Sequence, residues 1–264
     1  MSATAENTDL AGSVILVSGG TQGVGAAVVR ASVAAGARVA FTGRRRYVGE
    51  ALAAELTCAG GDVAFIAADV ADAAQATGSV EATVSRFGRI DGLCNAAGLT
   101  TRGTLLDTSA DLFDHHIAVN LRAPFFTMAA AVRDMTRRGE PGSIVNIISI
   151  SAHGGQPYLA PYVAAKAGLI GLTKNAAHAH RFDRIRVNGL NIGWTETEGE
   201  AQTQKQFHAA TDDWAARVAA HLPAGRLVQP TEVAAATVFL LSARSGVVTG
   251  SVIDWDQSVP GAHD

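Results

Sequence analysis

Short apolar segments alternate with segments typical of helices along almost the whole chain, and this alternation restricts the fold more than any other feature. Near-continuous apolar strands separated by helices indicate a parallel sheet that is covered on both faces. No internal repeat or low-complexity linker interrupts the pattern, so we expect one α/β domain over residues 12–264. The predicted strands are 14–17, 38–42, 63–68, 92–95, 143–148, 185–190 and 251–255, and the predicted helices are 24–35, 47–58, 73–87, 111–137 and 231–241, with a further helix that carries Tyr162 and Lys166.

Composition supports one domain and argues against several classes of partner. The 264 residues are 48% hydrophobic and 17% charged, which suits one well-packed domain of the large α/β kind. A net charge of -3 without a basic block gives no electrostatic support for a nucleic-acid partner. No apolar stretch reaches the length of a membrane span, and residues 1–11 lack a signal pattern, so we expect no membrane contact and a loose N-terminal tail.

The cysteines and histidines do not form a metal-binding pattern. Cys58 and Cys94 lack metal-ligand spacing, and we expect each to be a free, buried thiol, which is consistent with a reducing cytoplasm. His178 and His180 are two residues apart and would lie on different faces of a helix, so we expect no metal site.

A glycine-rich turn follows the first predicted strand and opens the first predicted helix. It reads Ser18-Gly19-Gly20-Thr21-Gln22-Gly23-Val24-Gly25. The glycines at 19, 23 and 25 leave room for a tight turn, for backbone close to a pyrophosphate and for packing of the helix on the sheet. The N-terminus of the helix would add free N–H groups for phosphate. This turn therefore predicts a dinucleotide site.

The end of the second predicted strand favours a phosphorylated dinucleotide. A carboxylate would hold an NAD ribose at this point, but the chain has Gly43-Arg44-Arg45-Arg46 and no acidic residue. A guanidinium matches a 2′-phosphate, so we expect NADP rather than NAD, with Arg44 as the main contact and Arg45 beside it. The alternative is that the three arginines form only a solvated helix start.

Tyr162 and Lys166 lie four residues apart, and Ser149 lies thirteen residues before the tyrosine, at the end of an apolar segment. In a helix, this offset puts phenol and ammonium on one face. The lysine charge would lower the tyrosine pKa from about 10 toward the range of a general acid or base, and the serine would hold a substrate oxygen. The alternative is a packing tyrosine and a solvated lysine, and the companion motifs decide against it.

These motifs together resemble the short-chain dehydrogenase/reductase family over almost the whole chain. The turn from Ser18 to Gly25 is similar to the family's Thr-Gly-x-x-x-Gly-x-Gly segment, with serine for threonine. The resemblance implies a Rossmann-type doubly wound parallel sheet in a single domain. It also implies a catalytic tetrad, which falls on Asn120, Ser149, Tyr162 and Lys166. With the arginines above, the expected cofactor-binding residues are Ser18, Gly19, Thr21, Gln22, Gly23, Val24, Gly25, Arg44, Arg45, Asp69, Val70, Asn95, Ala96, Ala97, Gly98, Tyr162, Lys166, Ile192, Gly193, Thr195 and Thr197.

Two segments depart from the family pattern. The family usually has Pro-Gly after the sixth strand, where this chain has Ile192-Gly193-Trp194. Gly193 and Thr197 stay in place, so backbone contact with a nicotinamide and a threonine bond to its carboxamide are still expected. Near the C-terminus, Asp256-Gln257-Ser258 replaces Asp-Gly-Gly in a region that packs at subunit contacts in the family. The family implies a homo-oligomer, a tetramer or a dimer.

The resemblance implies an NAD(P)-dependent enzyme that interconverts an alcohol and a carbonyl by hydride transfer. Tyr162 would exchange the proton, and Ser149 would stabilise charge on the substrate oxygen. Lys166 would lower the tyrosine pKa and bind the nicotinamide ribose, while Asn120 would hold a water that links the lysine to solvent. A cofactor-sensing protein without turnover is the alternative from a different class; it would be expected to have lost one of these side chains.

The segment 195–224 is polar and departs from the rhythm of strands and helices, so we expect a substrate lid there. A solvated surface insertion is the alternative. The mixture of hydrogen-bonding groups and rings suits a polyol or sugar, with an NAD-dependent alcohol or hydroxysteroid-type dehydrogenase as the other interpretation. The expected substrate contacts are Ser151, His153, Tyr158, Trp194 and His208, with Gln156, Glu196, Glu198 and Gln202 as further polar candidates.

Overall fold

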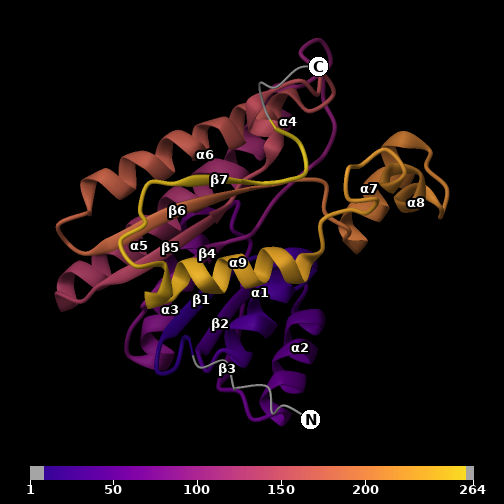
Figure 1. The fold of residues 1–264 in the computed structure, drawn as a ribbon. Coiled ribbons are helices and arrows are strands. Elements are labelled where there is room, and N and C mark those ends of the chain that lie inside the picture. Colours follow the sequence, from indigo (N-terminus) through magenta and orange to yellow (C-terminus); the bar gives the residue numbers. More distant parts are fainter. Residues whose placement is uncertain (1–8, 260–264) are drawn as a thin grey trace.

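A computed structural model describes residues 9–259 as a seven-stranded parallel sheet between two layers of helices (Figure 1). The strand order is β3-β2-β1-β4-β5-β6-β7. The sequence predicts this doubly wound Rossmann-type sheet in a single domain, and the prediction is confirmed. The strands are β1 (Val14–Ser18), β2 (Arg38–Gly43), β3 (Val63–Ala67), β4 (Gly92–Asn95), β5 (Gly142–Ile147), β6 (Ile185–Ile192) and β7 (Val252–Trp255).

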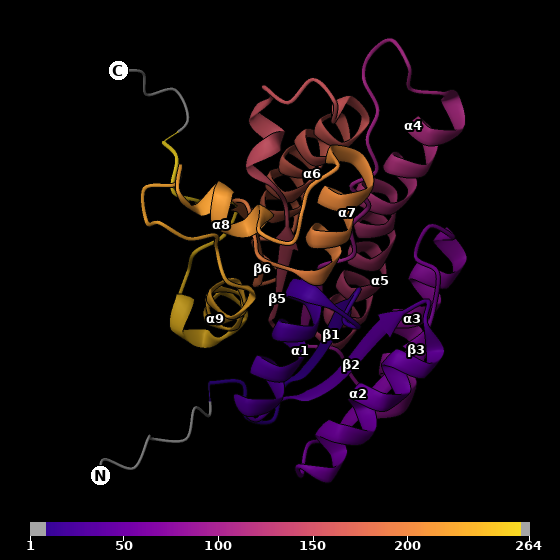
Figure 2. The same ribbon diagram turned by 90° about the vertical axis from the view of Figure 1, so that its right-hand side faces the viewer.

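The helices cover both faces of the sheet. They are α1 (Gly23–Ala34), α2 (Arg46–Cys58), α3 (Ala73–Phe87), α4 (Ala110–Ile117), α5 (Ala123–Arg138), α6 (Ala160–Ala179), α7 (Glu198–His208), α8 (Trp214–Ala219) and α9 (Pro230–Leu241). One layer consists of α1, α2 and α9, and the other of α3, α5 and α6 (Figure 2). The helices α7 and α8 stand apart from both layers, at one end of the molecule (Figure 1).

The central strand β1 shows why these strands are apolar at nearly every position. All of its residues are buried. Ile15 and Val17 join the core under α1 and α9, whereas Val14 and Leu16 join the core under α3 and α5. The chain runs outward from β1 to β3 and then returns to β4 on the other side of β1. A crevice for ligands opens at such a reversal of strand order, at the carboxyl ends of β1 and β4.

The packed part of the chain begins closer to the N-terminus than the sequence predicts. Of the predicted tail, residues 1–8 lie outside the described residues. Leu10 is buried, and its N–H donates to the Ala35 carbonyl oxygen at 3.0 Å. The folded part of the chain therefore starts before the predicted boundary at residue 11, because Leu10 adds an apolar side chain to the core under α1.

Three local features differ from the expectations. The long helix predicted over 111–137 is divided by a π-helical turn, Ala118–Arg122, between α4 and α5. Cys94 is buried as predicted, but the prediction of a buried Cys58 is wrong, because this residue ends α2 on the solvent side. The polar segment 195–224 contains the helices α7 and α8. Within residues 9–259, no helix is long and apolar enough to cross a membrane.

Candidate active site

The glycine-rich turn brings backbone very close to the loop after β4. Gly19 has a φ of +84°, and a Cβ atom at this position would lie 2.6 Å from the Cα atom of Ala97. The Gly19 N–H donates to the Thr42 hydroxyl at 3.0 Å, so β2 fixes the turn from the other side. Only glycine fits such a position, because both the dihedral angle and the space exclude a side chain.

The start of α1 leaves donors for a phosphate. Gln22 precedes the helix without a side-chain hydrogen bond to its first N–H groups. A Cβ atom on Gly25 would lie 2.0 Å from the Gly19 carbonyl oxygen, so turn and helix meet through backbone alone. Unpaired N–H groups at a helix N-terminus beside bare backbone match the needs of a pyrophosphate. The residues present therefore fit a dinucleotide cofactor.

The arginines after β2 have different partners. Arg45 donates to the Gln22 side chain in the glycine-rich turn, and Arg46 pairs with Glu50 one helical turn later at 3.4 Å. Arg44 is exposed, and it forms no hydrogen bond or ion pair with the described residues. Arg44 is therefore the arginine of this group that has no side-chain partner among the described residues.

Two side chains in the predicted cofactor-binding segments form hydrogen bonds within the protein. The Asn95 side chain is buried; its amide donates to the Asn146 side chain at 2.8 Å and accepts from the Thr127 hydroxyl at 2.7 Å. Only backbone groups of Asn95 remain for a cofactor. The Asp69 carboxylate accepts from the Ala71 N–H at 3.1 Å, which shapes the turn after β3. Val70, Ala96, Ala97 and Gly98 belong to the same two loops at the carboxyl ends of β3 and β4.

The segment after β6 connects the sheet to the glycine-rich turn. Ile192 is the last residue of β6, and Gly193 donates to the Trp255 carbonyl oxygen at 3.0 Å. The Thr195 hydroxyl donates to the Gly193 carbonyl oxygen at 2.9 Å. The Thr197 hydroxyl accepts from the Glu200 N–H and so caps α7, and its Cγ2 atom lies 3.3 Å from where a Cβ atom of Gly23 would be. The segment 195–224 thus begins beside Gly23.

Helix α6 holds Tyr162 and Lys166 in the protein interior. Their exposed fractions are 8% and 3%. The Lys166 ammonium donates to the Ile147 carbonyl oxygen at 2.8 Å and lies 5.7 Å from the centre of the Tyr162 ring. The predicted proximity of phenol and ammonium is therefore present, but the ammonium binds backbone at the end of β5.

The pKa of Tyr162 moves in the direction opposite to the prediction. The pKa of Tyr162 is raised to about 12, mainly by burial; a hydrogen bond with Ser149 and the charge of Arg102 oppose this rise, and the charge of Glu200 contributes to it. Burial lowers the pKa of Lys166 to about 8. The prediction of a lowered tyrosine pKa is wrong for the chain without ligands, because desolvation outweighs every charge near the phenol.

The two serine candidates have different surroundings. Ser149 follows β5 and its hydroxyl is the hydrogen-bonding partner of Tyr162; it also accepts from the Ser151 N–H at 3.2 Å. The Ser151 hydroxyl donates to the Gln156 side chain at 2.5 Å. Ser149, and not Ser151, is therefore the serine whose hydroxyl lies beside the Tyr162 phenol.

Asn120 lies inside the π-helical turn that interrupts the long helix. Its amide oxygen accepts from the Leu99 N–H, and its amide nitrogen donates to the Leu99 carbonyl oxygen, both at 3.0 Å. His116 is adjacent, 3.3 Å from the same amide nitrogen, and its ring lies edge-on to Tyr162. The Asn120 side chain therefore fixes the loop after β4. A water at this point would have to bind backbone groups of Asn120. That water stays a prediction.

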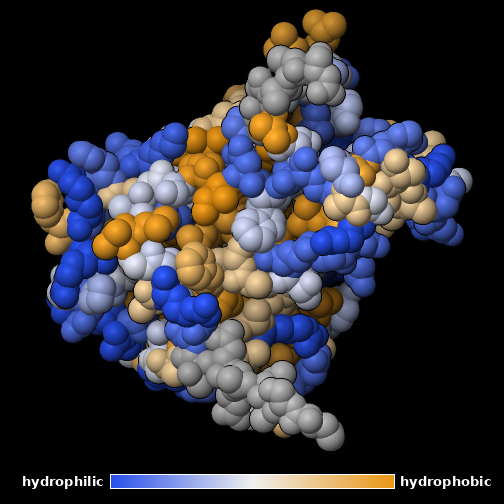
Figure 3. Space-filling view, viewed as in Figure 1, coloured by the Kyte–Doolittle hydropathy of each residue, from blue (hydrophilic) through white to orange (hydrophobic). Residues whose placement is uncertain are grey.

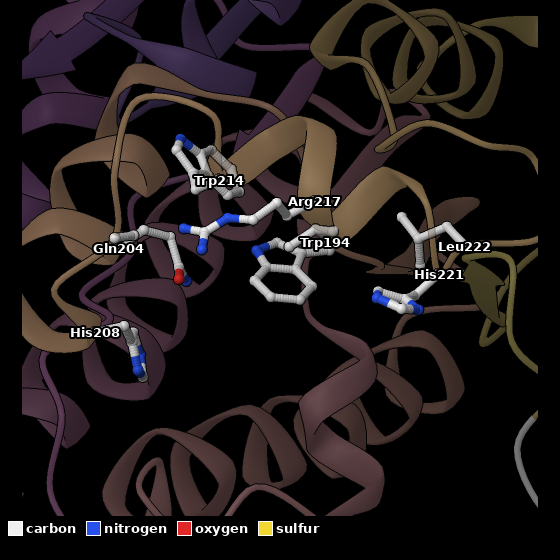
Figure 4. Close-up of a pocket in the computed structure, with 9 residues that line it drawn as sticks. Trp194, Gln204, His208, Trp214, Arg217, His221 and Leu222 are labelled. Carbon is white, nitrogen blue, oxygen red and sulfur yellow. The ribbon is translucent and has the colours of Figure 1, made fainter.

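A pocket of about 400 Å³ lies within the segment 195–224, whose residues form all of its walls except Trp194 (Figure 4). Trp194 donates through its indole N–H to Glu200 at 2.9 Å, and its ring lies 6.2 Å from that of Trp214. Trp194 and His208 are predicted substrate contacts that line this pocket. Its walls consist of Trp194, Gln204, His208, Ala210, Trp214, Arg217, Val218, His221 and Leu222.

Tyr162 does not line this pocket, but two charged residues connect the two regions. Glu200 accepts from Trp194 and Gln204 in the pocket, and its charge acts on Tyr162. Arg102 donates to His208 at 3.0 Å, and its charge also acts on Tyr162. Neither of these charged residues is among the sequence-based predictions. Arg102 could have been found from its place in the loop after β4, at the edge of the sheet where ligands bind.

The remaining predicted substrate contacts lie outside the pocket walls. Tyr158 stacks edge-on against His208, with ring centres 5.1 Å apart, and so lies at the rim. His153 contacts Asp254 at 3.1 Å and Asn191 at 3.2 Å, where β6 meets β7. The expected substrate contact of His153 has no counterpart in this pocket, because its ring is held at the edge strand.

Comparisons with known proteins agree with this architecture. A family model described as Enoyl-(Acyl carrier protein) reductase matches residues 19–258. A 2,5-dichloro-2,5-cyclohexadiene-1,4-diol dehydrogenase of Sphingobium indicum is 35% identical over 250 residues, which cover 94% of this chain and 97% of that protein. A 3-alpha-(or 20-beta)-hydroxysteroid dehydrogenase of Mycobacterium tuberculosis is 35% identical over 257 residues, which cover 97% and 93%.

A solved structure provides the same comparison in three dimensions. A single-residue variant of actinorhodin polyketide ketoreductase with NADPH superimposes with a TM-score of 0.89 at 29% identity, over 95% of this chain and 98% of that one. The family model covers most of this chain, and its relatives are dehydrogenases and reductases that act on CH–OH groups. The chain belongs to the short-chain dehydrogenase/reductase family, whose members use NAD(P)(H), and it is an oxidoreductase of alcohol or carbonyl substrates.

Proposed function

We propose that this enzyme interconverts a secondary alcohol on a ring and the corresponding ketone with NADP(H), and that Tyr162 moves the proton. The observation that carries the proposal is the buried phenol of Tyr162 with the Ser149 hydroxyl and the Lys166 ammonium close to it. A bound nicotinamide would supply or accept the hydride. The chain itself has to hold the substrate oxygen and transfer one proton.

In the direction of reduction, Tyr162 donates its proton to the carbonyl oxygen as negative charge develops there. The pKa of about 12 keeps the phenol protonated near neutral pH, so the acid form is loaded before the substrate binds. Ser149 donates a hydrogen bond to the same oxygen and stabilises its charge. Lys166 supplies positive charge beside the phenolate that remains, and its ammonium is oriented by the Ile147 carbonyl. Asn120 keeps the loop after β4 in place against α6.

The preference for NADP rests on Arg44. This guanidinium is exposed and unpaired within the described residues, and Gly43 before it brings no carboxylate. A free guanidinium at the end of β2 matches a 2′-phosphate. We expect Arg44→Ala to lower kcat/KM for NADPH by at least about tenfold and to leave kcat/KM for NADH nearly unchanged. Arg46→Ala is the matched control, since Arg46 already pairs with Glu50. Equal use of both cofactors by the unmodified enzyme contradicts the proposal.

The choice of a ring alcohol rests on the pocket walls. Trp194 and Trp214 present flat rings, and Val218 and Leu222 add aliphatic surface. Such walls favour an apolar ring over the polyol or sugar that the sequence suggests, because a polyol would lose hydrogen bonds to water against carbon. The relatives named for a cyclohexadiene diol and a hydroxysteroid also act on rings.

A substrate panel tests this choice. Cyclohexanone, decalone and steroid ketones are compared with keto-sugars and open-chain polyol ketones, each with NADPH and NADH. We expect the cyclic ketones to have the higher kcat/KM. Turnover confined to sugars or polyols would return the assignment to a polyol or sugar, and turnover of none of these compounds would contradict the proposed function.

We further propose a homo-oligomer that works in the cytoplasm. The edge strand β7 has apolar residues at every position except Asp254 and is poorly covered: Ile253 and Trp255 are each 36% exposed, and Phe239 of α9 is 43% exposed. In the space-filling view, apolar residues gather across the middle of this face, where β7 crosses in Figure 1 (Figure 3). A sheet edge of this kind suits contact with a second copy. The free thiols Cys58 and Cys94 are consistent with a reducing compartment.

A further inference from the structure

We propose that Arg102 binds an anionic group of the substrate, so that the substrate is a ring ketone or ring alcohol that also carries a carboxylate or a comparable acid. The inference rests on the proposed function, because it concerns the substrate of the same site. Arg102 lies in the loop between β4 and α4, seven residues after Asn95 at the carboxyl end of β4. Ligands of open α/β sheets bind at this edge.

Three contacts fix the Arg102 side chain. Its Nη1 donates to the Thr100 carbonyl oxygen at 2.8 Å, and its Nε donates to the His208 Nε2 atom at 3.0 Å. Its guanidinium also lies 5.3 Å from the centre of the Tyr158 ring. A guanidinium that is oriented in advance loses little conformational freedom when an anion binds.

The positive charge of Arg102 has no partner. Among residues 9–259, no carboxylate lies within ion-pair distance of it, and its Nη2 group donates no hydrogen bond. The arginine that lines the pocket differs from Arg102, because Arg217 lies 3.5 Å from Asp213 and donates to Thr211 at 2.9 Å. A half-buried cation without a counterion is unfavourable, and a carboxylate would satisfy both its charge and its free N–H groups.

Arg102 lies between the reacting phenol and the pocket. The Gly103 N–H donates to the Tyr158 carbonyl oxygen at 2.9 Å, and the Ala160 N–H donates to the Gly103 carbonyl oxygen at 3.0 Å. These bonds fix the Arg102 loop to the start of α6, which carries Tyr162. On the other side, Arg102 binds His208, which lines the pocket (Figure 4). One end of a substrate can therefore reach Tyr162 while its acidic group meets Arg102.

A negative group beside the pocket restricts where the anion binds. Glu200 accepts from Trp194 and Gln204, and its carboxylate would repel an anion beside these residues. The acidic group of the substrate is therefore expected on the Arg102 side, away from the Trp194 indole. His208 accepts from Arg102 and so is neutral in this arrangement, which leaves Arg102 as the cation.

The test compares two ring ketones that differ only in charge, 4-oxocyclohexanecarboxylate and 4-oxocyclohexanecarboxamide. Binding to the enzyme loaded with NADP⁺, which cannot reduce a ketone, is measured by the fluorescence of Trp194 and Trp214, which line the pocket. We expect the acid to bind at least about tenfold more tightly than the amide, as for a charge-assisted bidentate pair. Arg102→Met should abolish this preference, and Arg102→Lys should retain part of it. Arg217→Met is the matched control and should keep the preference.

Several results would overturn the inference. Equal or undetectable binding of acid and amide by the unmodified enzyme contradicts it, and so does a preference that survives in Arg102→Met or disappears equally in Arg217→Met. Thermal unfolding of each variant separates loss of binding from loss of the fold. Turnover is measured separately. Reduction of cyclohexanone and the amide as efficiently as the acid would sink the role of Arg102 alone, whereas tight binding of the acid without any turnover would sink the proposed function alone.

Discussion

Tyr162 and Lys166 are both buried, and burial moves their pKa values in opposite directions. The pKa of Tyr162 is raised to about 12, and that of Lys166 is lowered from 10.5 to about 8. Near neutral pH the phenol is therefore protonated and the lysine still charged. A charged lysine in the interior is unfavourable, and the Ile147 carbonyl compensates for only part of that cost.

Lys166 should make the stability of the enzyme depend on pH in a defined window. Between about pH 8 and 10.5 the unfolded chain holds the lysine proton and the folded chain releases it, so the lysine's contribution to stability improves as the pH rises. The full shift corresponds to about 3 kcal/mol. We expect Lys166→Met to be more stable than the unmodified enzyme below pH 8, with the difference in unfolding free energy shrinking toward pH 10. Denaturant unfolding across this range measures it.

Lys174 provides the control for that experiment, because it is exposed on the same helix. Lys174→Met removes a lysine without changing the buried one, so any pH dependence that both variants share does not come from the Lys166 ammonium. A pH-independent difference for Lys166→Met would mean that the buried ammonium keeps its ordinary pKa in the folded state.

At this scale the sequence locates the residues but not their environment. The spacing of Ser149, Tyr162 and Lys166 predicts that they lie close together, and the structure has Tyr162 near both others. The direction of the tyrosine pKa could not be predicted, because spacing says nothing about desolvation. Arg102 was missed for a related reason: it acts through a contact with His208, 106 residues away in the chain.

Helix α7 brings the charge of Glu200 to Tyr162. Glu200 lies in the first turn of α7 and raises the pKa of Tyr162 through its charge. Its Oε1 atom also accepts from Trp194 and Gln204, so the same side chain organises the pocket.

Removing the charge of Glu200 should make Tyr162 a stronger acid. Glu200→Gln keeps an oxygen acceptor for Trp194 and Gln204, so we expect these two contacts to persist while the tyrosine pKa falls. The pH profile of kcat/KM for alcohol oxidation, which needs the phenolate, should then shift toward lower pH. Glu198→Gln, a change in the same turn, is the control. An unshifted profile would show that Glu200 does not act on the phenol.

The sequence predicts most elements to within a few residues, with two instructive failures. The segment 195–224 is polar along its length, so its helices carry little apolar periodicity, although Thr197 as cap and the acidic first turn of α7 were visible signals. The π-helical turn at Asn120 was not predicted, since an insertion in a single turn only shifts the phase of the apolar pattern between two short helices. That turn nevertheless positions the Asn120 side chain against Leu99.

At the scale of the whole molecule, the alternation of strands and helices in the sequence predicts the parallel sheet. It does not predict that the edge at β7 is poorly covered. A strand whose residues are largely exposed has the same apolar sequence as a covered one. Ile253 and Trp255 point to the same face of β7, because they are two residues apart. Their exposure becomes reasonable if a second copy covers them.

Trp255→Lys should weaken the proposed oligomer. A lysine at the centre of an apolar contact between copies would have to be desolvated without a partner, so we expect a smaller species in light scattering coupled to size-exclusion chromatography. Phe182→Lys, at another exposed apolar position, should leave the mass unchanged. A monomeric unmodified enzyme, or an unchanged mass for Trp255→Lys, would contradict an interface at β7.

The central claim is tested most directly by the transfer of deuterium from deuterated NADPH to a ring ketone. The alcohol product is analysed by mass spectrometry, and the unmodified enzyme is compared with Tyr162→Phe. The unmodified enzyme should place deuterium on the carbinol carbon. Tyr162→Phe should lose this product by at least about a thousandfold, in line with the upper range for general acid catalysis, while it still binds NADPH. Deuterated alcohol formed by Tyr162→Phe at a rate close to that of the unmodified enzyme would show that the buried phenol is not the proton donor.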